Sequence, residues 1–181
     1  MSKTKKILFI LLGSFVLIVS SILVFAATKP DTFRVERSMI IPAPPEALHT
    51  IISDFRTWDQ WSPWEKLDPN MKKTFAGPVS GPGSSYAWEG NDDVGKGKME
   101  ILDSRQYESI TIKLEFIEPF PVSNTTQFSF APVEGGTKVT WAMYGNSPYI
   151  SKLFSVFMDM DAMIGKDFDN GLQNLKNLLA K

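Results

Sequence analysis

Cysteine is absent from the 181-residue sequence, and histidine occurs once, as His49. Without thiols the chain has no disulfide, no thiolate metal ligand and no cysteine nucleophile. A single imidazole leaves little scope for a histidine-rich metal centre. No serine or threonine lies in a nucleophile-elbow pattern, and no glycine-rich loop follows a strand in a phosphate-binding context. We therefore assign no catalytic residue, metal or cofactor, and these absences favour a binding protein over an enzyme.

An excess of positive charge is also lacking. The sequence has 19 Lys and Arg residues against 20 Asp and Glu residues. Lys3, Lys5 and Lys6 precede the first apolar segment, so the remainder of the chain is net acidic. An acidic surface repels phosphate backbones, which excludes nucleic acid as a partner. The hydrophobic content of 43% is instead typical of a chain that folds around an apolar core.

One long apolar segment lies near the N-terminus. Residues 7–27, ILFILLGSFVLIVSSILVFAA, contain no charged residue and no proline. At about 1.5 Å per residue, this helix would be about 30 Å long and would match the hydrocarbon core of a bilayer. We expect a transmembrane anchor at 7–27, after a short basic tail at 1–6 and before a linker at 28–31. The alternative is a signal peptide cleaved near Ala26, which would leave a secreted or periplasmic protein.

The flanking charges bear on the orientation of this segment. Three lysines precede it and only Lys29 follows it closely, which favours a single-pass protein with a cytoplasmic N-terminus and an extracytoplasmic C-terminal domain. Over a wider window Arg34 and Arg37 balance the count, so the opposite orientation stays open.

The remaining residues, 32–181, have the pattern of one α+β domain. Alternating apolar and polar residues between turn signals predict about seven strands. Their expected ranges are 33–41, 71–76, 84–89, 97–103, 108–117, 124–131 and 137–144. Because one face of each strand is apolar and the other polar, we expect an antiparallel sheet with one wetted face.

Helical patterns flank the strands. Residues 46–55 have an apolar face that includes Leu48 and Ile52, and His49 lies about 100° from it, at an exposed or rim position. Residues 58–64 form a short helical or turn segment. A long C-terminal helix is expected from an N-cap at Ser147, with a kink near Gly165 because about thirty residues is long for a globular helix.

This order of elements predicts a curved antiparallel sheet that wraps the long C-terminal helix. Such a sheet does not close tightly on a helix along its whole length. We therefore expect an apolar cavity in the gap between them.

Several segments in this order resemble the SRPBCC superfamily of START-like, polyketide cyclase-like and Bet v 1-like proteins. They are IPAPPEA at 41–47, DF at 54–55, WDQWSPW at 58–64, YAWEG at 86–90 and GKDFDNGL at 165–172. The resemblance covers residues 32–180 and implies the helix-grip fold. The superfamily contains carriers of lipids and hydrophobic ligands, cyclases and chaperone-binding domains, without a shared catalytic set to transfer. The apolar span lies outside the resemblance, and it resembles anchored bacterial members only in a general way.

Large apolar side chains on the strands and on the Trp-rich segment would form a cavity wall with few polar atoms. The expected ligand-binding residues are Trp61, Trp64, Phe75, Tyr86, Trp88, Met99, Ile101, Ile112, Leu114, Phe116, Phe128, Trp141 and Met143. Such a wall favours a hydrophobic or amphipathic, lipid-like molecule held non-covalently. The alternative is that the same side chains fill the space and leave no cavity.

The preferred hypothesis is a membrane-anchored binding domain for a hydrophobic or lipid-like small molecule. A polyketide cyclase-like or hydrolase-like enzyme on an apolar substrate is the first alternative. It requires an inward acid or base, and Glu89 is expected on the solvated rim instead. The second alternative is a packed protein-interaction module, although no pattern identifies a protein partner.

Overall fold

The computed structural model describes residues 2–180. These residues divide into two compact units, which are described separately. The first contains residues 2–33 and 146–160, and the second contains residues 34–145 and 161–180.

In the first unit, α1 (Lys3–Ala27) is the one helix within residues 2–180 that is long and apolar enough to cross a membrane. The side chain of Ser2 caps its start by accepting a hydrogen bond from the Lys5 backbone N–H at 3.3 Å. Ala26 is its one buried residue, so its apolar side chains face outward in every direction. Such a surface is typical of a membrane span or a signal anchor.

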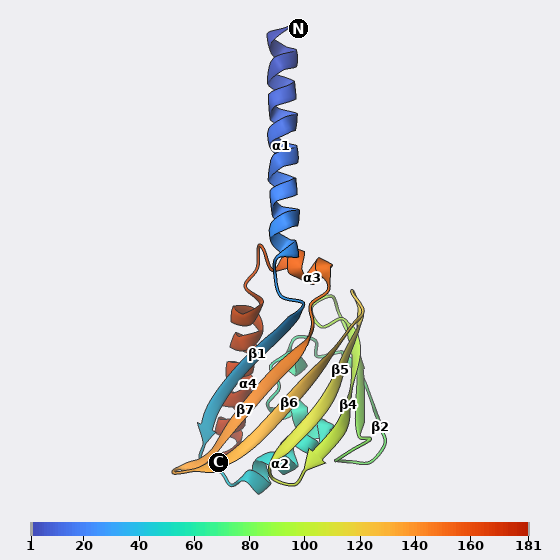
Figure 1. Cartoon of the computed structure of the whole chain (residues 1–181). Helices are drawn as coiled ribbons and strands as arrows, with labels where there is room; N and C mark the ends of the chain where they lie inside the picture. The colour runs from blue at the N-terminus through green and yellow to red at the C-terminus, as the bar shows by residue number, and fades with distance from the viewer. Residues whose placement is uncertain (1, 181) are drawn as a thin grey trace. The chain divides into compact units, whose positions relative to one another are not determined.

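The same unit contains a short helix, α3 (Tyr149–Phe154). The Tyr149 hydroxyl donates to the Leu23 carbonyl in α1 at 2.9 Å. The Ser147 backbone N–H donates to the Asp31 carbonyl at 2.7 Å, and the Lys152 ammonium forms an ion pair with the Asp31 carboxylate. These contacts hold α3 against the end of α1 and the linker after it (Figure 1).

The second unit is built on one seven-stranded sheet with the order β1-β7-β6-β5-β4-β3-β2, which confirms the predicted architecture. The strands are β1 (Thr32–Ile41), β2 (Lys72–Ala76), β3 (Ser85–Glu89), β4 (Lys96–Arg105), β5 (Ser109–Glu118), β6 (Val122–Val133) and β7 (Gly136–Asn146). Strands β2 to β7 form an antiparallel meander. The register shifts between Ile101 and Asp103, and a bulge of this kind increases the local twist of a sheet.

The helical elements of this unit pack on the inner face of the curved sheet (Figure 1). They are α2 (Pro45–Ser53), the short 3-10 helices η1 (Phe55–Gln60) and η2 (Trp64–Lys66), and α4 (Met160–Leu179). Pro45 starts α2, where its missing N–H costs nothing and its fixed φ suits a helix. Phe168, Leu172 and Leu175 recur at helical spacing and are buried, so α4 turns its apolar stripe toward the sheet.

The C-terminal segment does not form the single helix that we expected from Ser147. The chain forms two helices, α3 and α4, with the break at residues 155–159 and not at Gly165. Ser155 follows α3, and its hydroxyl donates to the Lys152 carbonyl at 2.7 Å, a local bond that competes with helix continuation. Pro148, not Ser147, occupies the N-cap position of α3.

Gly165 lies inside α4 for a reason other than a kink. A Cβ at this position would overlap the guanidinium of Arg37 on β1. Arg37 also donates to the Asp161 carboxylate at 2.8 Å, and this pairing lowers the pKa of Asp161. Glycine therefore allows β1 to hold the first turns of α4 by its arginine.

Candidate functional site

Strand pairing places the predicted ligand-binding residues of the strands on one face of the sheet. Residues directly opposite each other on neighbouring strands point to the same face. The rows are Phe75–Tyr86–Met99–Leu114, then Trp88–Gly97–Phe116, then Ile101–Ile112–Thr126–Met143, then Ile110–Phe128–Trp141. The sequence pattern therefore identified a contiguous apolar face.

Six aromatic rings meet between this face and the helices, and we call them the ring cluster. They are Trp58, Trp61, Trp64, Phe128, Trp141 and Phe168. Trp141 of β7 stacks on Phe168 of α4 with ring centroids 4.2 Å apart and planes 5° apart. A Cβ on Gly171 would lie 2.7 Å from the Trp141 ring, so glycine lets α4 approach the sheet closely. In this region the gap between sheet and helix is filled by the protein's own rings.

The thirteen predicted residues differ in burial. The buried ones are Trp61, Tyr86, Trp88, Met99, Ile101, Ile112, Phe128, Trp141 and Met143. The half-buried ones are Trp64, Phe75, Leu114 and Phe116. The first group forms the folding core, and the second is the part of the predicted wall that an incoming molecule reaches without unfolding the domain.

The surface hollows in the described part of the chain include two near the predicted wall. One, of about 140 Å³, is lined by Phe55, Arg56, Asp59, Glu65, Lys73 and Phe75. The other, of about 370 Å³, lies along β5 and β6 and includes Phe116. Neither has a lining residue from α4, so each lies outside the expected gap between sheet and helix.

Two indole N–H groups in the ring cluster have no hydrogen-bond acceptor among residues 2–180. They belong to Trp61 and Trp141, which are 0% and 2% exposed. By contrast, the neighbouring Trp58 indole donates to the Ile52 carbonyl at 3.0 Å. A buried polar group without a partner costs about 1–3 kcal/mol, so buried donors are nearly always paired. These two donors are unpaired, so a bound oxygen atom would satisfy them.

Glu65 of η2 is an inward carboxylate that the sequence did not reveal. Its side chain is 7% exposed, forms an ion pair with Lys73 of β2, and accepts a hydrogen bond from the Tyr86 hydroxyl at 2.8 Å. Burial, together with this negatively charged partner, raises the pKa of the Tyr86 phenol above its ordinary value. Phe75 stacks on Tyr86 with centroids 5.1 Å apart, and Arg56 lies over Phe75. The smaller hollow therefore joins aromatic rings to paired charges.

The other polar candidates have structural surroundings. His49 is half-buried, as its rim position predicts, and its Nε2 lies 2.9 Å from the Ser104 hydroxyl. Burial lowers the pKa of this imidazole. Glu89 is solvated, with a side chain 59% exposed. Within residues 2–180, no three His, Asp or Glu side chains come together as a metal site would require.

Glu65, Asn124 and Phe168 are the site residues that the sequence reasoning missed. Glu65 follows Trp64 in a segment whose clearest sequence feature is its tryptophans. Its carboxylate is buried only because β2 and β3 approach it in the folded chain. Asn124 is buried at the start of β6, and its side-chain oxygen has no partner in the described residues. Phe168 belonged to an apolar helical stripe, and that spacing was a usable signal.

The fold and this aromatic inner face define a helix-grip protein. Residues 32–180 match the family described as polyketide cyclase/dehydrase and lipid transport. The chain belongs to this family, and with it to the SRPBCC superfamily. No curated protein matches the chain significantly.

Solved structures share the fold at low sequence identity. A Staphylococcus aureus protein of unknown function is 15% identical with a TM-score of 0.59, covering 83% of this chain and 97% of its own. The Aha1 dimer from Colwellia psychrerythraea is 16% identical with a TM-score of 0.57, covering 80% and 94%. Ara h 8.0201 is 14% identical with a TM-score of 0.57, covering 83% and 99%. These likenesses establish the fold.

Proposed function

We propose that residues 32–180 bind one hydrophobic or amphipathic, lipid-like molecule non-covalently, and that α1 anchors this domain to a membrane. The observation that carries the proposal is the pair of buried, unpaired indole N–H groups of Trp61 and Trp141. The other rings of the ring cluster surround them with apolar surface. A ligand with an apolar body and an oxygen-bearing group matches both features, since the oxygen accepts from the indoles and the body is desolvated.

The ligand would enter the ring cluster past the side chain of Trp64. This side chain is half-buried, and its ring meets Trp141 edge-on at 5.6 Å and Phe168 at 6.2 Å. Rotation of this one side chain opens the ring cluster from the solvent side. The backbone of η2 stays in place during this motion because Glu65 remains bonded to Tyr86 and paired with Lys73.

The apolar body of the ligand would lie along the half-buried strand residues Leu114 and Phe116. Each square ångström of apolar surface removed from water contributes about 25 cal/mol. Affinity then comes mainly from the apolar wall, and the indole donors orient the oxygen-bearing end.

The test is direct measurement of bound lipid and of affinity in the full-length chain. Native mass spectrometry of gently extracted protein should reveal a co-purifying mass of lipid size. In detergent-free discs, Trp61→Phe and Trp141→Phe should each bind a fluorescent fatty acid several-fold more weakly, because they lack the N–H donor. Trp58→Phe is the matched control, since its N–H is already paired with Ile52. Equal affinities in all three variants, or no bound lipid, would contradict the proposal.

For the anchor, we propose a single span with the domain on the extracytoplasmic side. Because the chain has no cysteine, Val79→Cys provides one exposed thiol on the domain. An impermeant maleimide should label it in intact cells, and the mass of the extracted chain should include residues 7–27. Labelling only after lysis would show that the domain lies on the cytoplasmic side. A chain shortened near Ala26 would identify a cleaved signal peptide.

An acid–base enzyme is the second candidate, and Glu65 is the observation that favours it. This buried carboxylate beside the Tyr86 hydroxyl and a hollow of about 140 Å³ supplies the inward acid or base that such an enzyme needs. Glu65→Gln should abolish hydrolysis of an apolar aryl ester, whereas Glu89→Gln, at a solvated position, should not. Absence of turnover in the unaltered protein, or equal turnover in both variants, would exclude this function.

A further inference from the structure

Five large side chains around α3 are exposed, although three of them, Ile150, Phe154 and Phe157, have the helical spacing that predicted a buried stripe. We call them the α3 apolar surface: Tyr149, Ile150, Phe154, Phe157 and Met158, which are 47%, 51%, 47%, 70% and 42% exposed. They lie within ten consecutive residues, 149–158. Scattered exposed apolar residues are normal on a soluble protein, but a concentration of this kind marks a binding surface.

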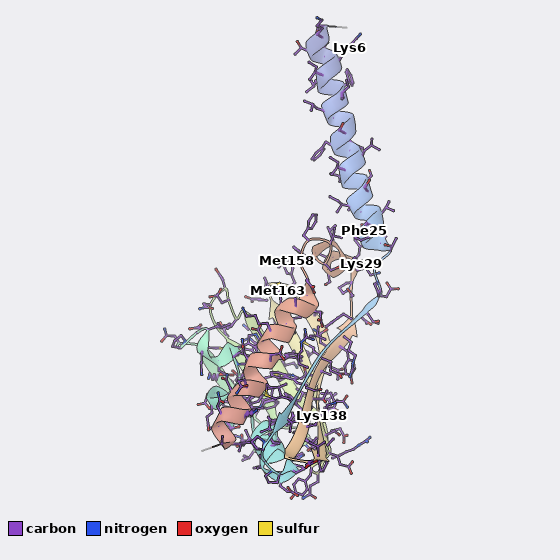
Figure 2. The ribbon with its side chains drawn as sticks, turned by 90° about the vertical axis from the view of Figure 1, so that its left-hand side faces the viewer. Lys6, Phe25, Lys29, Lys138, Met158 and Met163 are labelled. Atoms are coloured by element: carbon purple, nitrogen blue, oxygen red, sulfur yellow. The ribbon has the colours of Figure 1, made fainter. Side chains whose placement is uncertain are left out.

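The position of this surface along α1 is set by hydrogen bonds within the first unit. The Tyr149 hydroxyl donates to the carbonyl of Leu23, which precedes the end of α1 at Ala27 by about 6 Å of helix. Figure 2 shows Met158 at about the level of Lys29, which follows α1. The surface is therefore fixed to the last turn of the apolar segment.

Two lysines near α3 have partners within the first unit. Lys152 is 7% exposed and pairs with Asp31 of the linker, which lowers the pKa of the Asp31 carboxyl. Lys29 lies over the ring of Phe25, 4.9 Å from its centroid. The outer side of residues 149–158 thus presents aromatic rings, a thioether and an isoleucine.

A bilayer crossed by α1 would place its boundary at this level. The apolar segment is about as long as a hydrocarbon core is thick, so its last turn lies where acyl chains meet headgroups. Tyr is enriched at that depth because its ring is apolar and its hydroxyl polar. Phe and Met side chains lose their contact with water there and gain apolar surroundings.

We propose that the α3 apolar surface inserts into the headgroup–acyl boundary of the bilayer that α1 crosses. This inference rests on the proposed membrane anchor. The chain would then hold the membrane by two elements, one that spans it and one that lies in its surface.

Because the chain has no cysteine, each Cys variant carries a single thiol, and an environment-sensitive fluorophore is attached to that position alone. The full-length chain is reconstituted in phosphatidylcholine–phosphatidylglycerol vesicles with the probe at Phe157→Cys. Leu17→Cys, 69% exposed on α1, reports the span, and Val79→Cys, 59% exposed on the domain, is the aqueous control. Quenching is measured with aqueous iodide and with spin-labelled lipids of known depth.

We expect the Phe157→Cys probe to have blue-shifted emission and an iodide quenching constant several-fold below that of Val79→Cys. Lipid spin labels near the headgroup should quench it more strongly than labels deep in the acyl chains, whereas the deep labels should quench the Leu17→Cys probe. A probe at position 157 as accessible to iodide as the control, with position 17 shielded, would overturn this inference and leave the anchor standing. Iodide access at position 17 would overturn the anchor itself.

Shielding of position 157 from iodide without quenching by any lipid label would show that protein covers the surface. That result would replace the bilayer with a second copy of the chain or another part of it, and it too would overturn the inference. A second probe at Ile150→Cys should repeat the pattern of Phe157→Cys, because both positions belong to the same surface.

Discussion

Phe168 and Phe157 lie in the same stretch of apolar helical periodicity but have opposite surroundings. Phe168 is 1% exposed and stacks on Trp141 inside the ring cluster, whereas Phe157 is 70% exposed on the α3 apolar surface. The comparison teaches that an apolar stripe predicts which face of an element is removed from water, but it does not identify the surface that buries this face. In the ring cluster other side chains of the protein bury the stripe, and at α3 we propose that lipid does so.

The largest expected effect tests this contrast directly. Phe168→Ala removes a ring from the filled interior and should lower the free energy of unfolding by about 3–5 kcal/mol, because neighbouring rings cannot close the space. Phe157→Ala is the matched control and should change it by less than about 0.5 kcal/mol. Urea unfolding of the full chain in mild detergent, followed by circular dichroism, measures both. Equal losses would mean that Phe157 is also part of a protein core.

A smaller effect separates two tryptophans of the ring cluster whose centroids are 4.7 Å apart. Trp58→Phe breaks the indole bond to Ile52 and should cost about 1 kcal/mol more than Trp61→Phe, which removes a donor without an acceptor. Because both changes remove the same atoms from the same cluster, their difference reports the hydrogen bond. Urea unfolding of the two ligand-free variants, followed by circular dichroism, measures this difference in unfolding free energy. A greater loss in Trp61→Phe would indicate that its indole has a partner in the folded protein.

The smallest effect concerns pH at the rim of the second unit. Burial holds the pKa of His49 below its ordinary value of 6.5, so the folded protein resists protonation of this imidazole. The stabilising contribution is complete above about pH 6.5 and is lost as the pH falls through the lower pKa of the folded state. His49→Gln should flatten the dependence of unfolding free energy on pH below about 6.5. An unchanged slope would show that other groups produce it.

Much of the fold could be predicted because its signals are local. Alternation along residues such as Ile110, Ile112 and Leu114 identifies a strand with one apolar face, and the glycine pair at 135–136 marks one hairpin. The order of seven strands and a final helix then leaves few architectures. The boundary between α3 and α4 could not be predicted, since it depends on tertiary bonds such as Tyr149 to Leu23.

The candidate site was predictable only in part. The apolar residues of the inner face follow from strand periodicity, and the rows of paired residues confirm that they share it. Whether rings such as Trp61 and Trp141 line a cavity or fill it depends on how closely α4 approaches, which Gly171 permits. The inward carboxylate of Glu65 depends on contacts with Lys73 and Tyr86.

The amino-acid order alone determined the apolar N-terminal segment, the strands and the helix-grip topology, because periodicity and turn chemistry act over a few neighbouring residues. Tertiary structure decided which apolar faces meet each other and which stay exposed. It also left two indole donors unpaired and buried one carboxylate. Those outcomes depend on distances between side chains far apart in the chain, and close packing fixes such distances only when the whole domain has folded.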